Sequence, residues 1–407
     1  IVKYLKVRGS YGEVGNDQIG GDRFLYLPSS YGAASDSGVN KYNFGLASNP
    51  YTSLMIVENK IGNPDLTWEK AKKMNVGVDI NLFNNCLTAS FDIFKEKRNN
   101  ILANRSTSPM IIGANLPAYN FGEMENRGWE MDLNFRHHIQ DFHYWARFNY
   151  SFARNEIIYM DEVQKRYDYQ MTTGRRKNQF FGLIFDGYYN SWEEINALDR
   201  PKSSWSGNQL QPGDVKYVDV NQDGVIDDYD MVPIGYTPVP EIIYGFSFGA
   251  QYKGFDFSIL FQGADNVSIK YFGRSMWPFA KGEESAKSLI KERWTQERYE
   301  AGEKITFPRL SLNPNGETDH NYRPSTLWIR DASYLRLKNL EVGYTFTGGF
   351  VKRLNLNSVR LYFNGSNLFT WTDVVDLDPE APSRSGNVEI NTYPLQKVYN
   401  IGLNINF

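Results

Sequence analysis

Met74-Asn-Val-Gly-Val-Asp-Ile-Asn-Leu82 alternates apolar and polar residues without interruption. Successive side chains of a β-strand point to opposite faces, so this stretch predicts a strand with one apolar and one polar face. About ten such segments, each roughly ten residues long and rich in aromatic and β-branched side chains, recur along the 407-residue chain. The sequence therefore predicts an all-β protein.

The connections between these segments alternate between long and short. The short ones fall at about 83–85, 137–142, 253–254 and 347–356, and the long ones at about 98–124, 154–240, 266–333 and 368–397, with roughly 60 residues between the first two strands. Antiparallel strands connected in this way have one plain rim and one elaborate rim. Outer-membrane barrels have this organisation, with short periplasmic turns and long extracellular loops. A soluble β-sandwich or propeller is the alternative, but it rarely carries so many long loops at one end.

Composition is compatible with a barrel and excludes several other classes. No apolar run approaches the ~20 residues of a membrane helix, and the mean hydropathy of −0.52 suits strands whose lipid-facing and lumen-facing residues alternate. The net charge of −3 gives no support for nucleic-acid binding. With Cys86 as the single cysteine, an internal disulfide framework is excluded. The chain opens directly on a strand-like pattern, with no leader-like segment.

The alternating pattern also predicts details of the strands. Val78, Phe91, Leu133, Phe257 and Leu403 belong to the predicted lipid-facing set. The period slips by one residue at 338–339, which predicts a β-bulge. The last segment, 399–407, alternates aromatic or branched residues with Asn and Gly and ends in Phe, which resembles the C-terminal targeting signal of outer-membrane proteins. An open sheet would leave backbone groups unpaired in lipid, so the strands are expected to close with further ones.

Six stretches resemble SusC/RagA-type TonB-dependent outer-membrane transporters, in the order found in the C-terminal half of that family. They are Leu5-Lys-Val-Arg-Gly-Ser-Tyr-Gly12, Leu66-Thr-Trp-Glu-Lys70, Asn126-Arg-Gly-Trp-Glu130, Gly213-Asp-Val-Lys-Tyr-Val-Asp-Val-Asn-Gln-Asp-Gly224, Ser333-Tyr-Leu-Arg-Leu-Lys-Asn-Leu340 and Val359-Arg-Leu-Tyr-Phe-Asn-Gly-Ser-Asn-Leu-Phe-Thr370. The resemblance implies a multi-pass outer-membrane barrel of 22 strands, of which residues 1–407 would supply about ten. The plug domain and the first strands are absent from this sequence.

The resemblance also implies a function. It is active import of oligosaccharides, or of oligopeptides, with a SusD-like surface lipoprotein as partner and TonB energy delivered through the missing N-terminal part. The alternatives are a passive plugless porin and a soluble, calcium-stabilised carbohydrate-binding β-protein.

Residues 219–230 match the spacing of a calcium loop within the long 154–240 segment, which is expected to be an extracellular loop. Oxygen-bearing side chains stand at positions 1, 3 and 5, a glycine at 6, a main-chain carbonyl at 7 and a carboxylate at 12. The predicted ligands are Asp219, Asn221, Asp223, the Val225 carbonyl, Asp227 and Asp230. An aspartate at position 12, where EF-hands have glutamate, leaves Mg²⁺ open beside Ca²⁺. The alternative is an Asx-rich turn without metal. The ion would be structural and would order the loop.

Aromatic residues of the predicted outer loops are the candidate substrate contacts: Tyr188, Tyr189, Trp192, Trp205, Trp277 and Trp371. Flat aromatic faces suit sugar rings and apolar peptide side chains equally, and packing of the loops against one another is the alternative for each residue. Catalytic patterns are lacking. Three histidines lie near one turn (His137, His138 and His143), His320 stands alone, and no nucleophile elbow, phosphate loop or HExxH motif occurs. An enzyme is not predicted.

Overall fold

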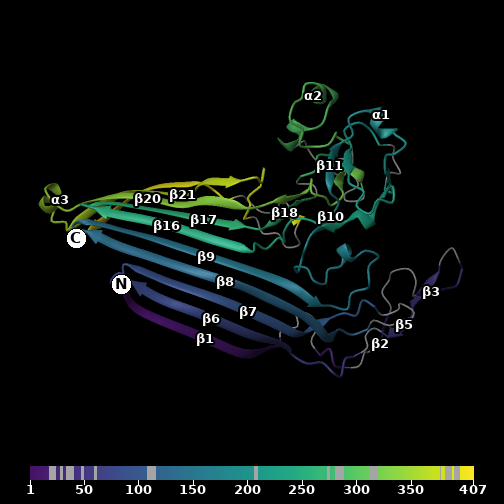
Figure 1. Ribbon diagram of the computed structural model, residues 1–407, viewed down its shortest axis with the longest axis horizontal. Helices are drawn as coiled ribbons and strands as arrows, with labels where there is room; N and C mark the ends of the chain where they lie inside the picture. Colours follow the sequence, from purple (N-terminus) through teal and green to yellow (C-terminus); the bar gives the residue numbers. More distant parts are fainter. Residues whose placement is uncertain are drawn as a thin grey trace.

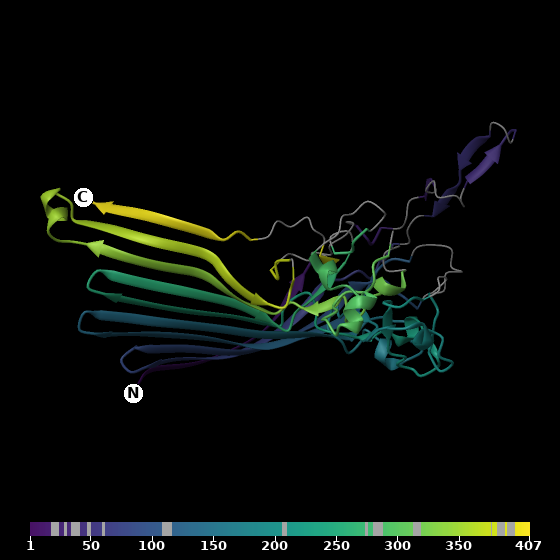
Figure 2. The same cartoon turned by 90° about the horizontal axis from the view of Figure 1, so that it is seen from above.

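The computed structural model describes residues 1–17, 24–27, 31–33, 41–46, 50–58, 62–107, 116–205, 210–272, 276–279, 288–311, 319–375, 377–380, 387–388 and 395–407. Its main feature is a curved, ten-stranded antiparallel sheet (Figures 1 and 2). In sheet order the strands are β1 (Val2–Asn16), β6 (Glu69–Leu82), β7 (Leu87–Ala103), β8 (Tyr119–Ile139), β9 (Phe142–Tyr159), β16 (Ile242–Tyr252), β17 (Phe255–Asp265), β20 (Tyr334–Phe346), β21 (Ser358–Thr372) and β23 (Val398–Asn406). No helix in the described part of the chain is both long and apolar enough to cross a membrane.

Each of these strands pairs with its neighbours in sequence order, which confirms the ten predicted strands. The two chain ends lie at the rim that carries the short connections, here called the turn rim, and the long connections gather at the opposite loop rim (Figure 1). β1 and β23 form the two edges of the sheet and stand apart in the view from above (Figure 2).

The register separates the two faces of the sheet. One row across seven strands is apolar: Ala89, Leu133, Phe148, Phe246, Phe261, Leu337 and Phe369. The adjacent row on the other face is largely polar: Thr88, Asn134, Arg147, Ser247, Leu260, Asn339 and Ser366. The register shift between Leu337 and Asn339 confirms the predicted bulge. One extra residue there returns the apolar side chains that follow it to the apolar face.

Several strands extend further than predicted. The first four long connections cover residues 17–68, 104–118, 160–241 and 266–333, and the last covers 373–397. Residues 98–103 and 119–124, predicted as connection, belong to β7 and β8. Charged cross-strand pairs, not apolar ones, lie where the observed strands continue: Lys95 lies 2.9 Å from Glu125, and Lys97 lies 2.8 Å from Glu123. Such pairs carry no hydrophobic periodicity, so the strands predicted from sequence end before the strands of the structure do.

Short elements at the loop rim build a second structural unit. The 160–241 connection contains η2 (Asp168–Gln170), β10 (Phe181–Gly182), β11 (Phe185–Tyr188), α1 (Trp192–Ile195), β12 (Lys202–Ser203), β13 (Val215–Tyr217), β14 (Val225–Ile226), η3 (Asp228–Asp230) and β15 (Val232–Pro233). The 266–333 connection contains β18 (Ser268–Tyr271), η6 (Ser288–Glu292), α2 (Gln296–Glu300), η8 (His320–Tyr322) and β19 (Ile329–Asp331). The remaining elements are β2 (Tyr31–Ala33), β3 (Lys41–Phe44), β4 (Tyr51–Leu54) and β5 (Ile56–Glu58), β22 (Asn387–Val388), and, at the turn rim, α3 (Phe350–Arg353).

The two connections 160–241 and 266–333 share a hydrophobic core and are called here the loop domain. Its most deeply buried side chains include Leu183, Val215, Tyr271, Met276, Phe307 and Tyr322. Residues from both connections contribute to this one cluster, and Val374 after β21 joins it. The loop domain is therefore a packed structure at the loop-rim end of the sheet (Figure 1).

Candidate functional site

The predicted metal loop lies on the loop domain, where β14 and η3 define its second half. Asp219 closes the loop, because its two carboxylate oxygens accept the main-chain N–H groups of Gln222 at 2.7 Å and Gly224 at 2.8 Å. Asp223 accepts the N–H of Val225 at 2.9 Å. Gly224 has φ of +81°, a conformation that side-chain-bearing residues rarely adopt.

Asp230 lies at the centre of this loop and is fully buried. Its carboxylate accepts the N–H groups of Val220 at 2.8 Å and Asp227 at 2.9 Å, and burial raises the pKa of the Asp230 carboxyl. In the described part of the chain, no three His, Cys, Asp or Glu side chains converge as a metal-holding group. The donor set is nevertheless made of oxygen atoms, the ligands that Ca²⁺ and Mg²⁺ prefer. Metal binding at 219–230 stays a prediction.

The six candidate aromatic residues occupy different environments and do not form one surface. Tyr188 and Trp277 are buried in the core of the loop domain, and Tyr189 is buried in a small cluster with Ile195 and Leu210. Trp205 packs against the main core, with the Arg323 guanidinium 4.0 Å from its ring centroid.

The other two candidates are exposed. Trp192 is 51% exposed at the start of α1. Trp371 is 54% exposed on the apolar face of β21, near Phe369 and Phe261. Substrate contact by any of the six side chains stays a prediction.

Each of the four histidines contacts another ring, a hydroxyl group or a main-chain carbonyl. His138 and His143 face each other across β8 and β9 with ring centroids 5.5 Å apart, and His137 stacks on Tyr144. His320 is embedded in the loop domain, with Nε2 2.7 Å from the Val215 carbonyl and Nδ1 3.0 Å from Ser203 Oγ. Burial lowers the pKa of His320.

The polar face of the sheet carries an arginine network near one edge. Arg8 on β1 donates to Asp79 on β6 at 3.1 and 3.2 Å and to Asp92 on β7 at 2.6 Å. Ser90 Oγ bridges Arg8 and Asp79. Gly77 leaves the necessary space, since a Cβ atom there would stand 2.5 Å from Asp92 Oδ1. Three strands are thus connected by side chains on the face opposite the apolar rows.

A second arginine network of the same kind lies near the other edge of the sheet. Arg360 on β21 donates to Asp256 on β17 at 3.0 Å and to Glu341 on β20 at 2.6 Å. Gly343 provides the space here, because a Cβ atom would lie 2.7 Å from both Arg360 Nη2 and Asp256 Oδ2. In each network one arginine is therefore shared by two carboxylates from different strands.

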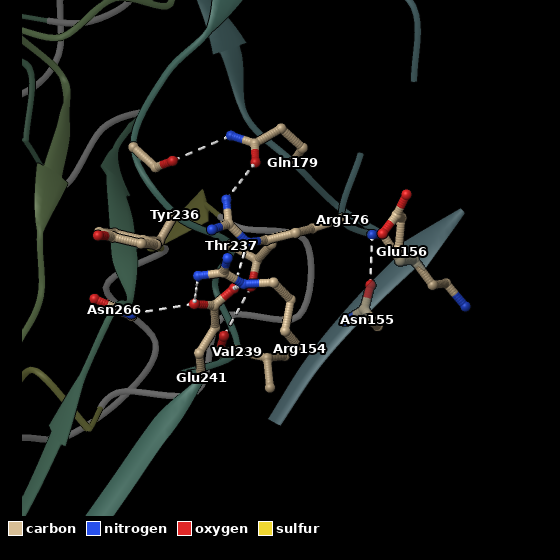
Figure 3. Close-up of polar contacts among 12 residues, drawn as sticks. Arg154, Asn155, Glu156, Arg176, Gln179, Tyr236, Thr237, Val239, Glu241 and Asn266 are labelled. Carbon is tan, nitrogen blue, oxygen red and sulfur yellow. Dashed lines mark hydrogen bonds and ion pairs between the residues drawn. The ribbon is translucent and has the colours of Figure 1, made fainter. Parts of the chain in front are cut away.

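A third network fastens the loop domain to the loop rim (Figure 3). Glu241, which is 4% exposed, receives a bidentate pair of hydrogen bonds from Arg154 at 2.8 and 2.9 Å. Arg176 from the long connection binds the same carboxylate, and Asn266 Nδ2 donates to it at 3.1 Å. Strand ends and loop segments therefore meet at one buried carboxylate.

A sequence comparison identifies the family of the chain. Residues 1–368 match the family described as TonB dependent receptor-like, beta-barrel. The chain belongs to this family of TonB-dependent receptor barrels. The predicted resemblance and the predicted barrel fold are both confirmed.

Individual relatives agree with the family. The barrel chain is 28% identical to TonB-dependent receptor P3 of Formosa agariphila, over 99% of this chain and 39% of that protein. It is 26% identical to TonB-dependent receptor SusC of Bacteroides thetaiotaomicron, over 100% of this chain and 38% of that protein. Among solved structures, the RagAB peptide importer in its open-open state superposes with a TM-score of 0.69 at 24% identity, over 100% of this chain and 40% of that one. The barrel chain thus spans about two-fifths of the length of the relatives it matches.

These findings define the class of the protein. It is an outer-membrane receptor barrel from a family of transporters, not of enzymes. The apolar face of the sheet is accordingly the lipid-facing, outward face, and the polar face looks into the lumen.

Sequence reasoning missed the three arginine networks. Arg8, Asp79 and Asp92 stand at alternate, unremarkable positions of their strands, and only the cross-strand register brings them together. Gly77 and Gly343 were the available signal, because a glycine opposite a long charged side chain marks a place where that side chain can cross the neighbouring strand.

Proposed function

We propose that this receptor barrel belongs to an active importer that takes up oligosaccharides, or oligopeptides, through the outer membrane. In this proposal a SusD-like lipoprotein covers the loop rim, and TonB supplies the energy through a part of the protein that precedes the barrel strands. The observation that carries the proposal is the loop domain on a barrel of this family. A passive pore has little use for so large a folded unit with its own hydrophobic core at one rim.

The lumen-facing networks support the same proposal. Arg8 with Asp79 and Asp92, and Arg360 with Asp256 and Glu341, give the lumen wall fixed polar groups at two places. Polar, charged lumen walls suit hydrophilic cargo and the domains that move past it. The choice between glycan and peptide rests on family frequency alone and favours glycan.

Purification from native membranes tests the proposal. The complete gene product, carrying an affinity tag at a loop tip, should bring down a surface lipoprotein in mild detergent. Deleting its gene should abolish growth on an oligosaccharide or peptide mixture that the parent strain uses, and measuring which mixture is affected identifies the cargo. Recovery of the barrel alone, together with unchanged growth of the deletion strain on every polymeric nutrient tested, would contradict the importer.

We also propose that a structural Ca²⁺, or Mg²⁺, occupies residues 219–230. The spacing of the oxygen donors and the closed form of the loop support this. A bound ion would neutralise part of the negative charge of the Asp219, Asp223 and Asp230 carboxylates. These side chains already hold the main chain of the loop in place through the N–H groups that they accept.

A further inference from the structure

On the outward face of β6, β7, β8 and β9 the apolar rows stop abruptly. Their last row consists of Val76, Ile93, Trp129 and Phe152. The next two rows towards the loop rim are charged except at Met74: Met74, Lys95, Arg127 and Arg154, then Lys72, Lys97, Glu125 and Glu156. One face of the same strands therefore passes from apolar to charged within a single row, a step of about 7 Å along the strand.

The boundary is marked by aromatic rings. Trp129 stacks on Tyr150 with ring centroids 4.7 Å apart and lies 5.9 Å from Phe91. Tryptophan and tyrosine gather where the hydrocarbon of a membrane meets the headgroups. The charged rows begin one row beyond Trp129, so they stand at headgroup level on the loop-rim side of the membrane.

Five cations at this level are called here the basic rim patch: Lys70, Lys72, Lys95, Lys97 and Arg127. They are accompanied by carboxylates, with Lys70 3.6 Å from Glu13, Lys95 2.9 Å from Glu125, Lys97 2.8 Å from Glu123 and Arg127 3.8 Å from Glu156.

These ion pairs leave the cations accessible. The side chains of Lys70, Lys95, Lys97 and Arg127 remain 50%, 54%, 42% and 60% exposed, and Lys72 is exposed as well. Exposed ion pairs hold their partners weakly, so the ammonium and guanidinium groups keep donors free for a further anion.

Among the ten strands of the described sheet, the patch is confined to β6, β7 and β8. β16 begins at Ile242 and β17 ends at Asp265, both in register with Phe152, so these two strands stop where the charged rows begin. The patch belongs to the strands that run furthest towards the loop rim, of which β8 (Tyr119–Ile139) is the longest.

We propose that the basic rim patch binds the phosphate groups of outer-leaflet lipid headgroups. Lysine and arginine side chains are the usual partners of phosphate oxygens, arginine in bidentate geometry and lysine as a point charge. Clustered basic residues beside a bilayer attract anionic headgroups. The inference rests on the outer-membrane location of the barrel, and it does not depend on cargo, partner or energy source.

Native mass spectrometry of the complete gene product in detergent tests the inference. The protein is titrated with a diphosphorylated glucosamine-disaccharide lipid and, separately, with the same lipid after dephosphorylation. The wild-type protein should retain the diphosphorylated lipid preferentially. The variant K72Q/K95Q/R127Q should bind it about fivefold more weakly for each cation removed and should lose the preference.

Matched variants separate binding from assembly. K253Q/K352Q/R353Q removes the same kinds of charge from exposed positions at the turn rim and should bind like wild type. The charge-conserving variant K72R/K95R/R127K should also retain binding. Heat-modifiable electrophoretic migration shows whether each barrel has assembled.

Two results would overturn the inference. Equal retention of both lipids by the wild-type protein overturns the inference even if the glutamine variant fails to assemble. Equal weakening by the loop-rim and turn-rim variants also overturns it, because binding would then follow net charge alone. Either result leaves the importer proposal untouched, since that proposal is tested by uptake.

Discussion

Asp219 and Asp223 already bind main-chain N–H groups, yet each carboxylate oxygen accepts in two directions and retains a lone pair for a cation. We therefore expect Ca²⁺ to stabilise the loop domain. At a concentration of 100 times the dissociation constant, a bound ligand adds about 2.7 kcal/mol to the free energy of unfolding. For a domain of this size that corresponds to an increase in Tm of roughly 5–10 °C.

Differential scanning fluorimetry with EDTA, Ca²⁺ and Mg²⁺ measures this shift. Asp219→Ala and Asp223→Ala should abolish it, whereas Asp199→Ala, at an exposed position of the same connection, should leave it intact. If neither ion changes the Tm of the wild-type protein, residues 219–230 form an Asx turn without metal.

His320 makes the loop domain sensitive to acid. Burial lowers its pKa, although the Val215 carbonyl and the carboxylates of Asp214 and Asp319 act in the opposite direction. The unfolded chain, with a histidine pKa of about 6.5, therefore binds a proton before the folded one does. The free energy of unfolding should be constant above that pH and should fall as the pH drops from about 6.5 towards the folded-state pKa.

Thermal melts followed by tryptophan fluorescence between pH 5 and pH 8 test this expectation. His320→Gln retains one donor and one acceptor in the pocket and should flatten the profile near pH 6. His143→Gln, at the exposed turn rim, serves as the control and should melt like wild type at every pH. A profile that is the same with and without His320 would assign the acid sensitivity to other groups.

At the level of elements, β8 offers a matched pair of positions for testing orientation. Leu133 lies in the seven-strand apolar row and Asn134 in the adjacent polar row. A charge on the lipid face near the bilayer midplane costs ~2–4 kcal/mol, and much less in the lumen. Leu133→Arg should therefore reduce the yield of heat-modifiable barrel in membranes severely, and Asn134→Arg should reduce it little. Equal yields of the two variants would contradict this assignment of the faces.

The sheet was predictable from sequence because its signal is local. Alternation at 74–82 and the period slip at 338–339 each follow from a few neighbouring residues, and both appear in the structure. The loop-rim parts of β7 and β8 were missed, since charged residues such as Lys97, which lies opposite Glu125 and near Glu123, carry no apolar periodicity. The environments of Tyr188 and Trp277 could not be predicted at all, because their burial depends on contacts between two connections that are far apart in sequence.

At the scale of the whole molecule, buried polar side chains connect the sheet to the loop domain. The sheet is held by its ladders, the loop domain by its own core, and Glu241 with Arg154 and Arg176 forms a buried polar connection between them. Arg336 on β20 makes a similar contact with the last long connection, since it pairs with Asp378 at 2.7 Å and with Glu380 beyond the end of β21. Both contacts therefore involve arginines that lie near the loop-rim ends of their strands.

The shared core of the loop domain also fixes an order of events during biogenesis. It unites residues from Leu183 to Val374, so its contacts have a large sequence separation, and we expect them to form more slowly than the pairing of neighbouring strands. During refolding into micelles, the electrophoretic shift of the barrel should therefore precede the change in fluorescence of buried Trp277 and Trp328. Single-tryptophan versions would resolve the two phases, and simultaneous phases would show that strands and core form in one step. Until the later phase is complete, the nascent receptor would expose an unfinished apolar surface outside the cell.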